Sequence, residues 1–184
     1  MLVGISGTPG TGKTSVSYLL KKNGYKIVDL NKTAIKKGFI TGIDKKRNSK
    51  IIDIDRLDTY IKEKYADITD IIFVEGHIAH LLQNIDKIII LRCHPDELKK
   101  RLIQKKWRKE KIMENIEAEI LDIILCETTD IHPEENIFEI DTTQKPIETV
   151  AGSIIEIIKN EFKPMKKYNI GKIDWSEEIL KKFQ

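Results

Sequence analysis

The sequence has few cysteines and no long apolar run. Its 184 residues include 2 Cys, Cys93 and Cys126, without a C-x-x-C spacing or a nearby pair of metal ligands. This pattern argues against a disulfide framework and a zinc site, so we expect two reduced packing thiols with no disulfide partner. No segment approaches the roughly 18 apolar residues of a membrane span, and the start lacks the basic and apolar regions of a signal peptide. We therefore expect a soluble, cytoplasmic protein with no membrane partner.

Arginine is also scarce, because the 32 basic residues comprise 27 Lys and only 5 Arg. The net charge of +3 is modest, whereas a nucleic-acid-coating protein usually carries a denser basic excess. Affinity for RNA is therefore expected only as a local patch. With 33% charged and 40% apolar residues, the composition is that of a globular chain, and the length suits one domain.

Short apolar runs alternate with helical patterns along the chain. The predicted strands cover residues 2–6, 25–29, 71–75, 87–92 and 136–141, and the predicted helices cover about 13–22, 95–106, 109–127 and 147–162, with another beginning near 55. This order is typical of a parallel sheet covered by crossover helices. The predicted class is α/β, with a mainly parallel five-stranded sheet in three layers. Residues 31–64 are long for a βα connection and are predicted to form a polar insertion leading into a helix.

The segment G-T-P-G-T-G-K-T at residues 7–14 matches G-x-x-x-x-G-K-[ST] directly after a strand and at the start of a helix. Its glycines allow backbone N–H groups to approach phosphate oxygens, and the helix amino terminus adds partial positive charge. Lys13 is expected to reach the terminal phosphates, and Thr14 to offer its hydroxyl to Mg²⁺. The sequence thus predicts a P-loop NTPase that binds a nucleoside triphosphate through Gly7, Gly10, Thr11, Gly12, Lys13, Thr14 and Ser15.

A second contact to Mg²⁺ is predicted at Glu75, where the apolar strand 71–75 ends. Glu occupies a position where Asp is commoner, so we expect it to reach the ion through water; a solvent-facing strand cap is the alternative. His77 would lie beside the phosphates, where an imidazole orients water or transfers a proton, although a structural role stays open. His80 is expected to be structural.

Other features separate this chain from GTP switches. Ras-like GTPases read guanine with N-K-x-D, whereas Asn31 and Lys32 are followed by Thr33 and Ala34 here. The size suits a small phosphotransferase with an acceptor flap and a closing lid. Several lysines in the insertion suggest an anion-facing flap, and basic residues crowd around Trp107. A solvated helix junction would show the same charge run.

The ordered set of motifs resembles one family, the atypical adenylate kinases of archaea and the eukaryotic nucleus (adenylate kinase isoenzyme six type), also described as small-subunit ribosome maturation ATPases. The resemblance spans about residues 1–160. Besides the phosphate loop, it rests on D-I-D-R at 53–56, V-E-G-H at 74–77, I-L-R at 90–92 and E-N-I-E-A-E-I at 114–120. It implies a nucleoside-monophosphate-kinase-like fold and the Mg²⁺-dependent reaction ATP + AMP = 2 ADP. It also implies ATP hydrolysis and a role in maturation of the small ribosomal subunit through a platform ribosomal protein.

The resemblance also implies an organisation and further site residues. Residues 1–162 would form the core, with a monophosphate-binding flap at about 30–53 and a lid at about 104–114. The tail, 163–184, lies beyond the resemblance; its Asp174-x-x-Glu177 spacing predicts a short helix that Trp175 packs on the core. Family members carry Arg-Gly where this chain has Lys105 and Lys106, so Lys105 would act as a point charge and Arg108 would share its role. The acceptor would contact Asp53, Arg56, Arg92 and one of the flap lysines 32, 36 and 37, here assigned to Lys36. Thr142 and Thr143 resemble the loop whose backbone meets adenine.

Two other functions stay open on the sequence. In one, the protein is an assembly ATPase without significant kinase activity, the groove holds a protein or RNA, and Glu75 and His77 position water. In the other, it is a small P-loop kinase for a non-nucleotide acceptor.

Overall fold

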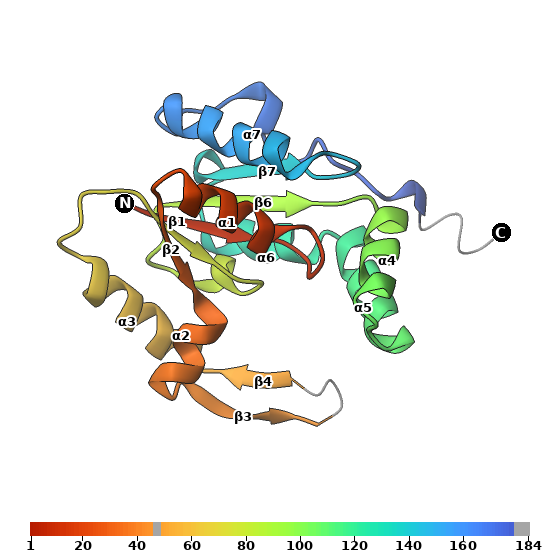
Figure 1. The fold of residues 1–184 in the computed structure, drawn as a ribbon, viewed down its shortest axis with the longest axis horizontal. Coiled ribbons are helices and arrows are strands. Elements are labelled where there is room, and N and C mark those ends of the chain that lie inside the picture. The colour runs from red at the N-terminus through yellow and green to blue at the C-terminus, as the bar shows by residue number, and fades with distance from the viewer. Residues whose placement is uncertain (46–48, 179–184) are drawn as a thin grey trace.

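Five parallel strands form the centre of the protein (Figure 1). The computed structural model describes residues 1–45 and 49–178. The order across the sheet is β2-β5-β1-β6-β7. The strands are β1 (Leu2–Ser6), β2 (Lys26–Asp29), β5 (Ile72–Glu75), β6 (Lys87–Arg92) and β7 (Ile137–Asp141). The α/β class and the parallel five-stranded sheet are therefore confirmed, and each predicted strand is correct to within one residue.

Helices cover both faces of this sheet. Successive side chains of a strand point to opposite faces, so Phe73 packs into one apolar cluster while Ile72 and Val74 pack into the other. The first cluster lies under α1 (Lys13–Lys22) and α7 (Ile147–Lys159), and the second under α2 (Leu30–Lys37), α3 (Ile54–Tyr65) and α6 (Ile123–Ile131). Burial on both faces explains why the strands are continuously apolar. The three-layer arrangement is confirmed.

Two smaller units lie beyond the sheet. Helices α4 (Pro95–Gln104) and α5 (Lys109–Ile120) pack on each other around an apolar cluster of their own. An antiparallel hairpin of β3 (Ile40–Asp44) and β4 (Ser49–Ile52) projects separately, below the sheet in Figure 1. The polar insertion predicted at 31–64 therefore contains α2 and this hairpin before α3. The sequence does not predict this hairpin, because none of its strand residues is buried, and Ile43 and Ile51 are 63% and 50% exposed, so the pattern of apolar residues is weak.

The predicted helix at 109–127 is wrong, because the chain breaks between α5 and α6 at Asp122. Asp122 has φ 53°, a left-handed conformation that few residues other than Gly, Asn and Asp adopt readily. The guanidinium of Arg92 contacts the Asp122 carboxylate and donates to the Glu119 carbonyl at 3.2 Å. Those bonds give the carboxyl end of α5 a hydrogen-bond partner and stabilise the break between the two helices. Left-handed residues also shorten two other predicted helices, at Lys106 after α4 and at Glu161 and Phe162 after α7.

The described residues also form three short 3₁₀ helices, η1 (Ala79–Leu81) after β5, η2 (Glu134–Asn136) before β7 and η3 (Lys166–Tyr168) in the tail after α7. Tyr168 is buried in the α1–α7 cluster, and Trp175 packs on the α4–α5 cluster. Residues 179–184, which the predicted short tail helix would include, lie outside the described part of the chain.

The two cysteines differ in environment. Both are free; Cys93 is buried, whereas Cys126 is exposed, so the expectation of a packing role is wrong for Cys126. Within the described ranges, the structure contains no helix with the length and apolarity needed to cross a membrane.

Arg92 lies at the end of β6 inside a cluster of carboxylates. The residue is 3% exposed, and its guanidinium donates to Glu119 at 2.9 Å and to Glu139 at 2.6 Å, besides its contact with Asp122. Burial alone would lower its pKa, but the three carboxylates outweigh burial and raise the pKa of Arg92. One guanidinium therefore joins β6, β7, α5 and the start of α6.

Replacing Arg92 with Gln should leave these carboxylates without their cation. Removing one partner of a buried ion pair costs roughly 3–5 kcal/mol, so we expect a loss of about 3 kcal/mol in the free energy of unfolding at pH 7. Burial raises the pKa values of Asp122 and Glu139, whereas the charge of Arg92 limits this rise. In the variant, the pKa values of both carboxyl groups should therefore rise further. Protonation then stabilises the folded state, so the loss should shrink as pH falls to 5 in urea unfolding.

A matched control is Lys163→Gln, which removes an ion pair with Glu161 whose side chains are 70% and 74% exposed. It should change the unfolding free energy little at either pH. A deficit of Arg92→Gln that is the same at pH 7 and pH 5 would contradict the electrostatic explanation.

Candidate active site

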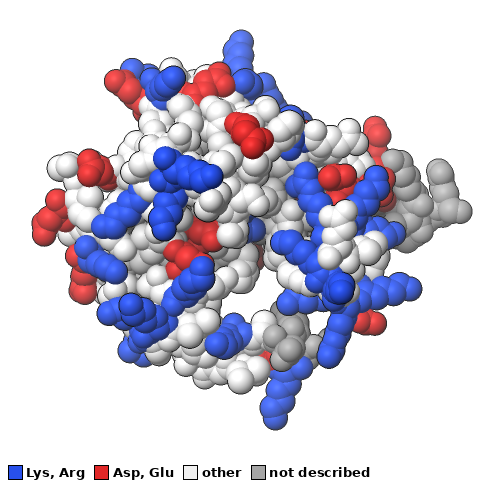
Figure 2. All heavy atoms as spheres, in the orientation of Figure 1, with Lys and Arg blue, Asp and Glu red and all other residues white. Residues whose placement is uncertain are grey.

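A cavity of about 1190 Å³ opens at the carboxyl ends of the parallel strands, where α/β proteins bind their ligands. Its walls come from the loop before α1, the end of β5, the α4–α5 connection and the start of α7. Figure 2 shows the molecule hollowed at this position, with Lys and Arg side chains around the opening. The cavity therefore combines a phosphate-type loop with a basic surround.

The loop at 7–14 requires glycine at three points. Gly7, Gly10 and Gly12 have φ of 136°, 103° and 106°, values that a residue with a side chain rarely adopts. A Cβ atom on Gly7 would also lie 2.3 Å from the carbonyl oxygen of Leu91. Gly12 forms the N-cap of α1, so the loop directs the helix amino terminus at the cavity.

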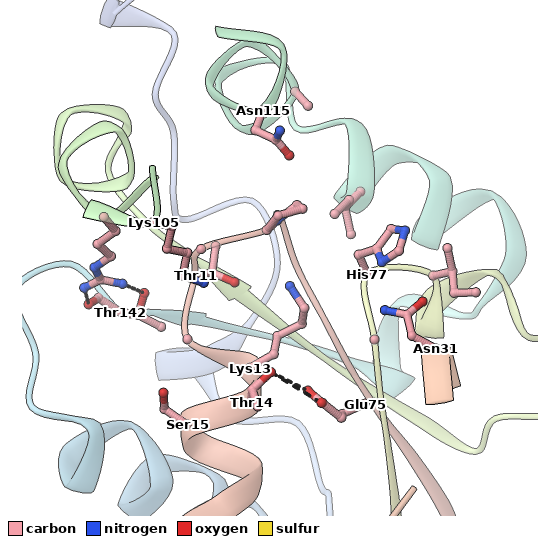
Figure 3. Close-up of a pocket in the computed structure, with 18 of the residues that line it drawn as sticks. Thr11, Lys13, Thr14, Ser15, Asn31, Glu75, His77, Lys105, Asn115 and Thr142 are labelled. Carbon is pink, nitrogen blue, oxygen red and sulfur yellow. Dashed lines mark hydrogen bonds between the residues drawn. The ribbon is translucent and has the colours of Figure 1, made fainter. Parts of the chain in front are cut away.

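Lys13 extends over this loop into the cavity (Figure 3). Its ammonium group donates to the carbonyl oxygens of Gly7 at 2.6 Å and Thr8 at 3.1 Å. Burial lowers the pKa of Lys13 to about 8, against the attraction of Glu75 and Glu119. A cation held inside a concave set of backbone amides is suited to a phosphate group.

Thr14 and Glu75 face each other beside Lys13. The Thr14 hydroxyl lies 3.4 and 3.5 Å from the two carboxylate oxygens of Glu75, and donates to them. Burial raises the pKa of Glu75, and the neighbouring Asp29 carboxylate adds to the rise. A hydroxyl and a carboxylate are hard oxygen ligands that fit Mg²⁺ when water and phosphate oxygens complete the shell. Among the residues that the structure describes, no group of three or more His, Cys, Asp and Glu could hold a metal.

The two histidines after β5 have different surroundings. His77 lines the cavity and is exposed to solvent there. Desolvation by the surrounding protein, together with the charge of Lys13, lowers its pKa to about 4. His77 is thus neutral near pH 7 and able to accept a proton. His80 is buried between the Ser6 hydroxyl and the Glu127 carboxylate, with both distances 2.9 Å, an arrangement consistent with the structural role expected for it.

The structure brings together most of the residues predicted for phosphate, metal and ATP contacts. In Figure 3, Lys105 and Thr142 lie on one side of Lys13, and His77 and Asn31 lie on the other. The predicted residues that line the cavity are Gly10, Thr11, Gly12, Lys13, Thr14, Ser15, Glu75, His77, Lys105 and Thr142.

Several predicted acceptor residues lie elsewhere. Arg92 is enclosed by carboxylates in the core, so its guanidinium faces protein and not the cavity. Asp53 caps α3 by accepting from the Arg56 amide at 3.1 Å, and the Arg56 guanidinium lies 5.1 Å from the Phe39 ring centre. Lys36 is exposed on α2. None of these four is among the residues that line the cavity.

Two other predicted residues also lie off the cavity wall. Arg108 is exposed at the N-cap of α5. The Thr143 hydroxyl donates to Asp141 at 2.5 Å and accepts from the His94 amide at 2.8 Å. Its side chain is therefore engaged within the protein.

Arg101, which flanks the predicted lid but was not among the predicted site residues, also lines the cavity. Its guanidinium donates to the Thr142 carbonyl at 2.8 Å and to the Thr142 hydroxyl at 3.3 Å. A signal was present, since Arg101 precedes Lys105 by four residues, the spacing that places two side chains on one helix face. The other lining residues that were not predicted include Asn31, Ser49, Gln104, Trp107, Lys111, Asn115, Glu127 and Lys145.

The chain is similar to known proteins along almost its whole length. A family model described as an AAA domain matches residues 3–122. A Methanocaldococcus jannaschii protein named "Putative adenylate kinase" is 38% identical over 181 residues, 98% of this chain and 96% of that protein. An Archaeoglobus fulgidus protein of the same name is 41% identical over 179 residues, 97% of this chain and 94% of that protein. The chain belongs to this adenylate-kinase-like family.

Solved structures confirm the fold of this adenylate-kinase-like protein. A shikimate kinase from Acinetobacter baumannii, in complex with shikimate, has a TM-score of 0.61 and 16% identity, and the match covers 87% of this chain and 93% of that one. A shikimate kinase from Bacteroides thetaiotaomicron has a TM-score of 0.55 and 18% identity, and the match covers 86% of this chain and 98% of that one. At these identities the likeness concerns the fold, and the predicted P-loop kinase fold is confirmed. The ribosome-maturation branch of the family stays a prediction.

Proposed function

We propose that this adenylate-kinase-like protein transfers the γ-phosphate of ATP to AMP and releases two molecules of ADP. The observation that carries this proposal is a single cavity in which the phosphate loop, Lys13 and the Thr14–Glu75 pair lie between two projecting units. Its volume of about 1190 Å³ exceeds the roughly 300–1,000 Å³ of pockets for one small ligand. Two nucleotides therefore have room to meet at the loop.

ATP would lie along the loop, with its phosphates on the backbone amides and its base near Thr142. The double contact of Arg101 with Thr142 supports this assignment, since it holds the loop after β7 against α4. Lys145 and Ile147 continue the same wall. ATP is thus assigned the side of the cavity formed by α4, β7 and α7.

AMP would occupy the opposite side. We assign residues 1–162 to the kinase core, 30–53 to the flap, 104–114 to the lid and 163–184 to the tail. Asn31 and Ser49 of the flap line the cavity, and Asn31 lies across Lys13 from Lys105 and Thr142 (Figure 3). Lys36, Asp53 and Arg56 lie on or beside the flap without lining the cavity, so they would meet AMP only after the flap closes.

The residues at the loop would supply the chemistry. Mg²⁺, when bound, neutralises charge on the β- and γ-phosphates, and Thr14 with Glu75 would hold it, Glu75 through water. Lys13 follows the moving phosphoryl group and offsets its charge in a loose transition state. Lys105 adds a second cation from the lid. Neutral His77 would orient a water molecule in the slower hydrolysis of ATP.

A second activity, maturation of the small ribosomal subunit as an ATPase, is proposed on a separate observation. Lysines gather at the mouth of the cavity (Figure 2), and Lys105, Lys111 and Lys145 reach its wall. A basic rim suits an anionic surface such as rRNA or a ribosomal protein bound to it. In this role, the flap would contact the partner and ATP hydrolysis would release it.

The kinase proposal predicts AMP-dependent ADP formation. With ATP and Mg²⁺, addition of AMP should raise ADP production well above hydrolysis, and more than CMP, GMP or UMP. Lys13→Ala should lower the rate by about 10²–10³-fold, the scale for loss of one group that stabilises transition-state charge. Shikimate and other non-nucleotide hydroxyl compounds serve as acceptor controls. No increase with AMP would reject the kinase and leave the assembly ATPase as the leading function.

His77 separates transfer from hydrolysis. Because AMP supplies its own nucleophile, His77→Ala should lower ATP hydrolysis roughly 10²-fold, the lower range for a group that positions or deprotonates water, and lower transfer to AMP much less. His77→Gln, which keeps a hydrogen-bonding group, should retain more hydrolysis. Unchanged rates of both reactions would return His77 to a structural role.

The ribosomal proposal predicts retention that depends on nucleotide. Immobilised protein should retain purified small ribosomal subunits or their platform protein, and ATP should change the amount retained. Lys13→Ala should bind without the ATP effect, which separates specific release from binding to a basic surface. Retention that ignores ATP in both proteins would count against the assembly role.

A further inference from the structure

The carboxylate of Glu119 joins three segments that are distant in sequence. Glu119 lies on α5 and is 2% exposed. One of its oxygens accepts the Thr8 hydroxyl of the phosphate loop at 2.5 Å. The other accepts the Arg92 guanidinium at 2.9 Å, the Cys93 amide at 3.0 Å and the Trp175 indole N–H at 3.4 Å. The loop, the end of β6 and the tail therefore meet at one buried group.

On the loop side, this carboxylate orients Thr8. The Thr8 carbonyl accepts from the Thr11 amide at 3.2 Å, from the Thr11 hydroxyl at 2.9 Å and from the Lys13 ammonium at 3.1 Å. Thr8 itself is 2% exposed, and neither Thr8 nor Glu119 is among the residues lining the cavity. Glu119 therefore acts on the loop without touching a ligand there.

On the tail side, the chain supplies N–H groups to a cluster that is rich in carboxylates. Glu119, Asp122 and Glu139 share one guanidinium, so negative charge exceeds positive charge in the cluster. The Gly171 amide donates to Glu139 at 2.7 Å, and the Trp175 indole donates to Glu119. Hydrogen bonds to ionised acceptors are stronger than neutral ones, and here they offset part of the excess charge.

The ring of Trp175 fixes the direction of its N–H bond. It packs on the α4–α5 cluster and meets the His94 ring edge to face, with ring centres 5.0 Å apart. The indole therefore cannot turn away from Glu119 without losing apolar contacts. The tail, through Trp175, and α5, through Glu119, are therefore both connected to Thr8 of the phosphate loop.

We propose that Glu119 is a positioning residue for the phosphate loop, and that Trp175 of the tail holds Glu119 in place. The proposal rests on the proposed binding of ATP at this loop. Through Thr8, the Glu119 carboxylate sets where Lys13 and Thr11 present their polar groups to the phosphates. Loss of the link should weaken ATP binding and leave AMP binding largely unaffected.

The first test breaks the link at the loop with Thr8→Val, which keeps the shape of the side chain and removes the hydroxyl. Since a hydrogen bond to a charged group is lost, the Kd for Mg-ATP measured by calorimetry, and the KM for ATP, should rise roughly tenfold, while the KM for AMP stays within about twofold. Thr8→Ser restores the hydroxyl and should recover most of the affinity. Equal Kd values for wild type and Thr8→Val would overturn the proposal.

The second test breaks the link at the tail. Trp175→Phe keeps an aromatic ring and removes the N–H, and it should raise the Kd for ATP by about threefold, less than Thr8→Val, because Arg92 and Cys93 still hold Glu119. The matched control is Tyr168→Phe, which removes a different tail bond, from the Tyr168 hydroxyl to Glu156 at 2.6 Å. It should leave ATP affinity unchanged. Weakening by Tyr168→Phe equal to that by Trp175→Phe would mean that the tail acts only through general stability, and the positioning role would fail.

A spectroscopic measurement reads the link directly. Trp107 and Trp175 are the only tryptophans of the sequence, so a Trp107→Phe background makes Trp175 the single reporter. Saturating Mg-ATP should shift the Trp175 emission in this background, and addition of Thr8→Val should abolish most of the shift even when ATP is bound. An undiminished shift would overturn the coupling. A wild-type protein that binds no ATP would instead overturn the proposed function, and this proposal with it.

Discussion

The contact of Arg92 with three carboxylates is the interaction on which much of the structure depends. It lies where β6 reaches the carboxyl edge of the sheet, and it holds β7, α5 and the start of α6 to that strand. The end of α5 follows from it, because the guanidinium takes both the Glu119 carbonyl and the Asp122 side chain. Placement of α5 in turn decides where residues 104–114 lie relative to the cavity. A single side chain thus connects core packing with the geometry of the site.

The elements of the sheet could be predicted from the sequence because burial on both faces requires continuous apolar runs. The phosphate loop could be predicted for a comparable local reason, since Gly7, Gly10 and Gly12 occupy backbone conformations that other residues avoid. The hairpin β3–β4 could not, because none of its strand residues is buried. The break at Asp122 also could not, because it depends on Arg92, 30 residues away in sequence.

The positions of arginine and lysine around the cavity differ from those that the motifs implied. Of the described arginines, Arg101 alone lines the cavity, and it braces Thr142. Arg92 and Arg56 contact protein groups, and Arg47 lies outside the described residues. The lysines that line the cavity are Lys13, Lys105, Lys111 and Lys145. Arg92 and Arg101, with several donors in a fixed plane, each make several bonds at once, whereas each lysine presents a single mobile charge. The resemblance assigned Arg92 to substrate because sequence position alone does not reveal which carboxylates surround a side chain.

The apolar cluster between α4 and α5 has a mechanical consequence. It is separate from the two clusters that cover the sheet, so the two helices pack as a unit with an apolar interior of its own. Contacts of Glu119 and Asp122 with Arg92 fix one end of this unit, and its other end places Lys105 and Trp107 at the cavity wall. A tilt about the fixed end would leave the two clusters of the sheet undisturbed, so its free-energy cost would come from the bonds of Arg101 to Thr142 and from the packing of α4 on the phosphate loop.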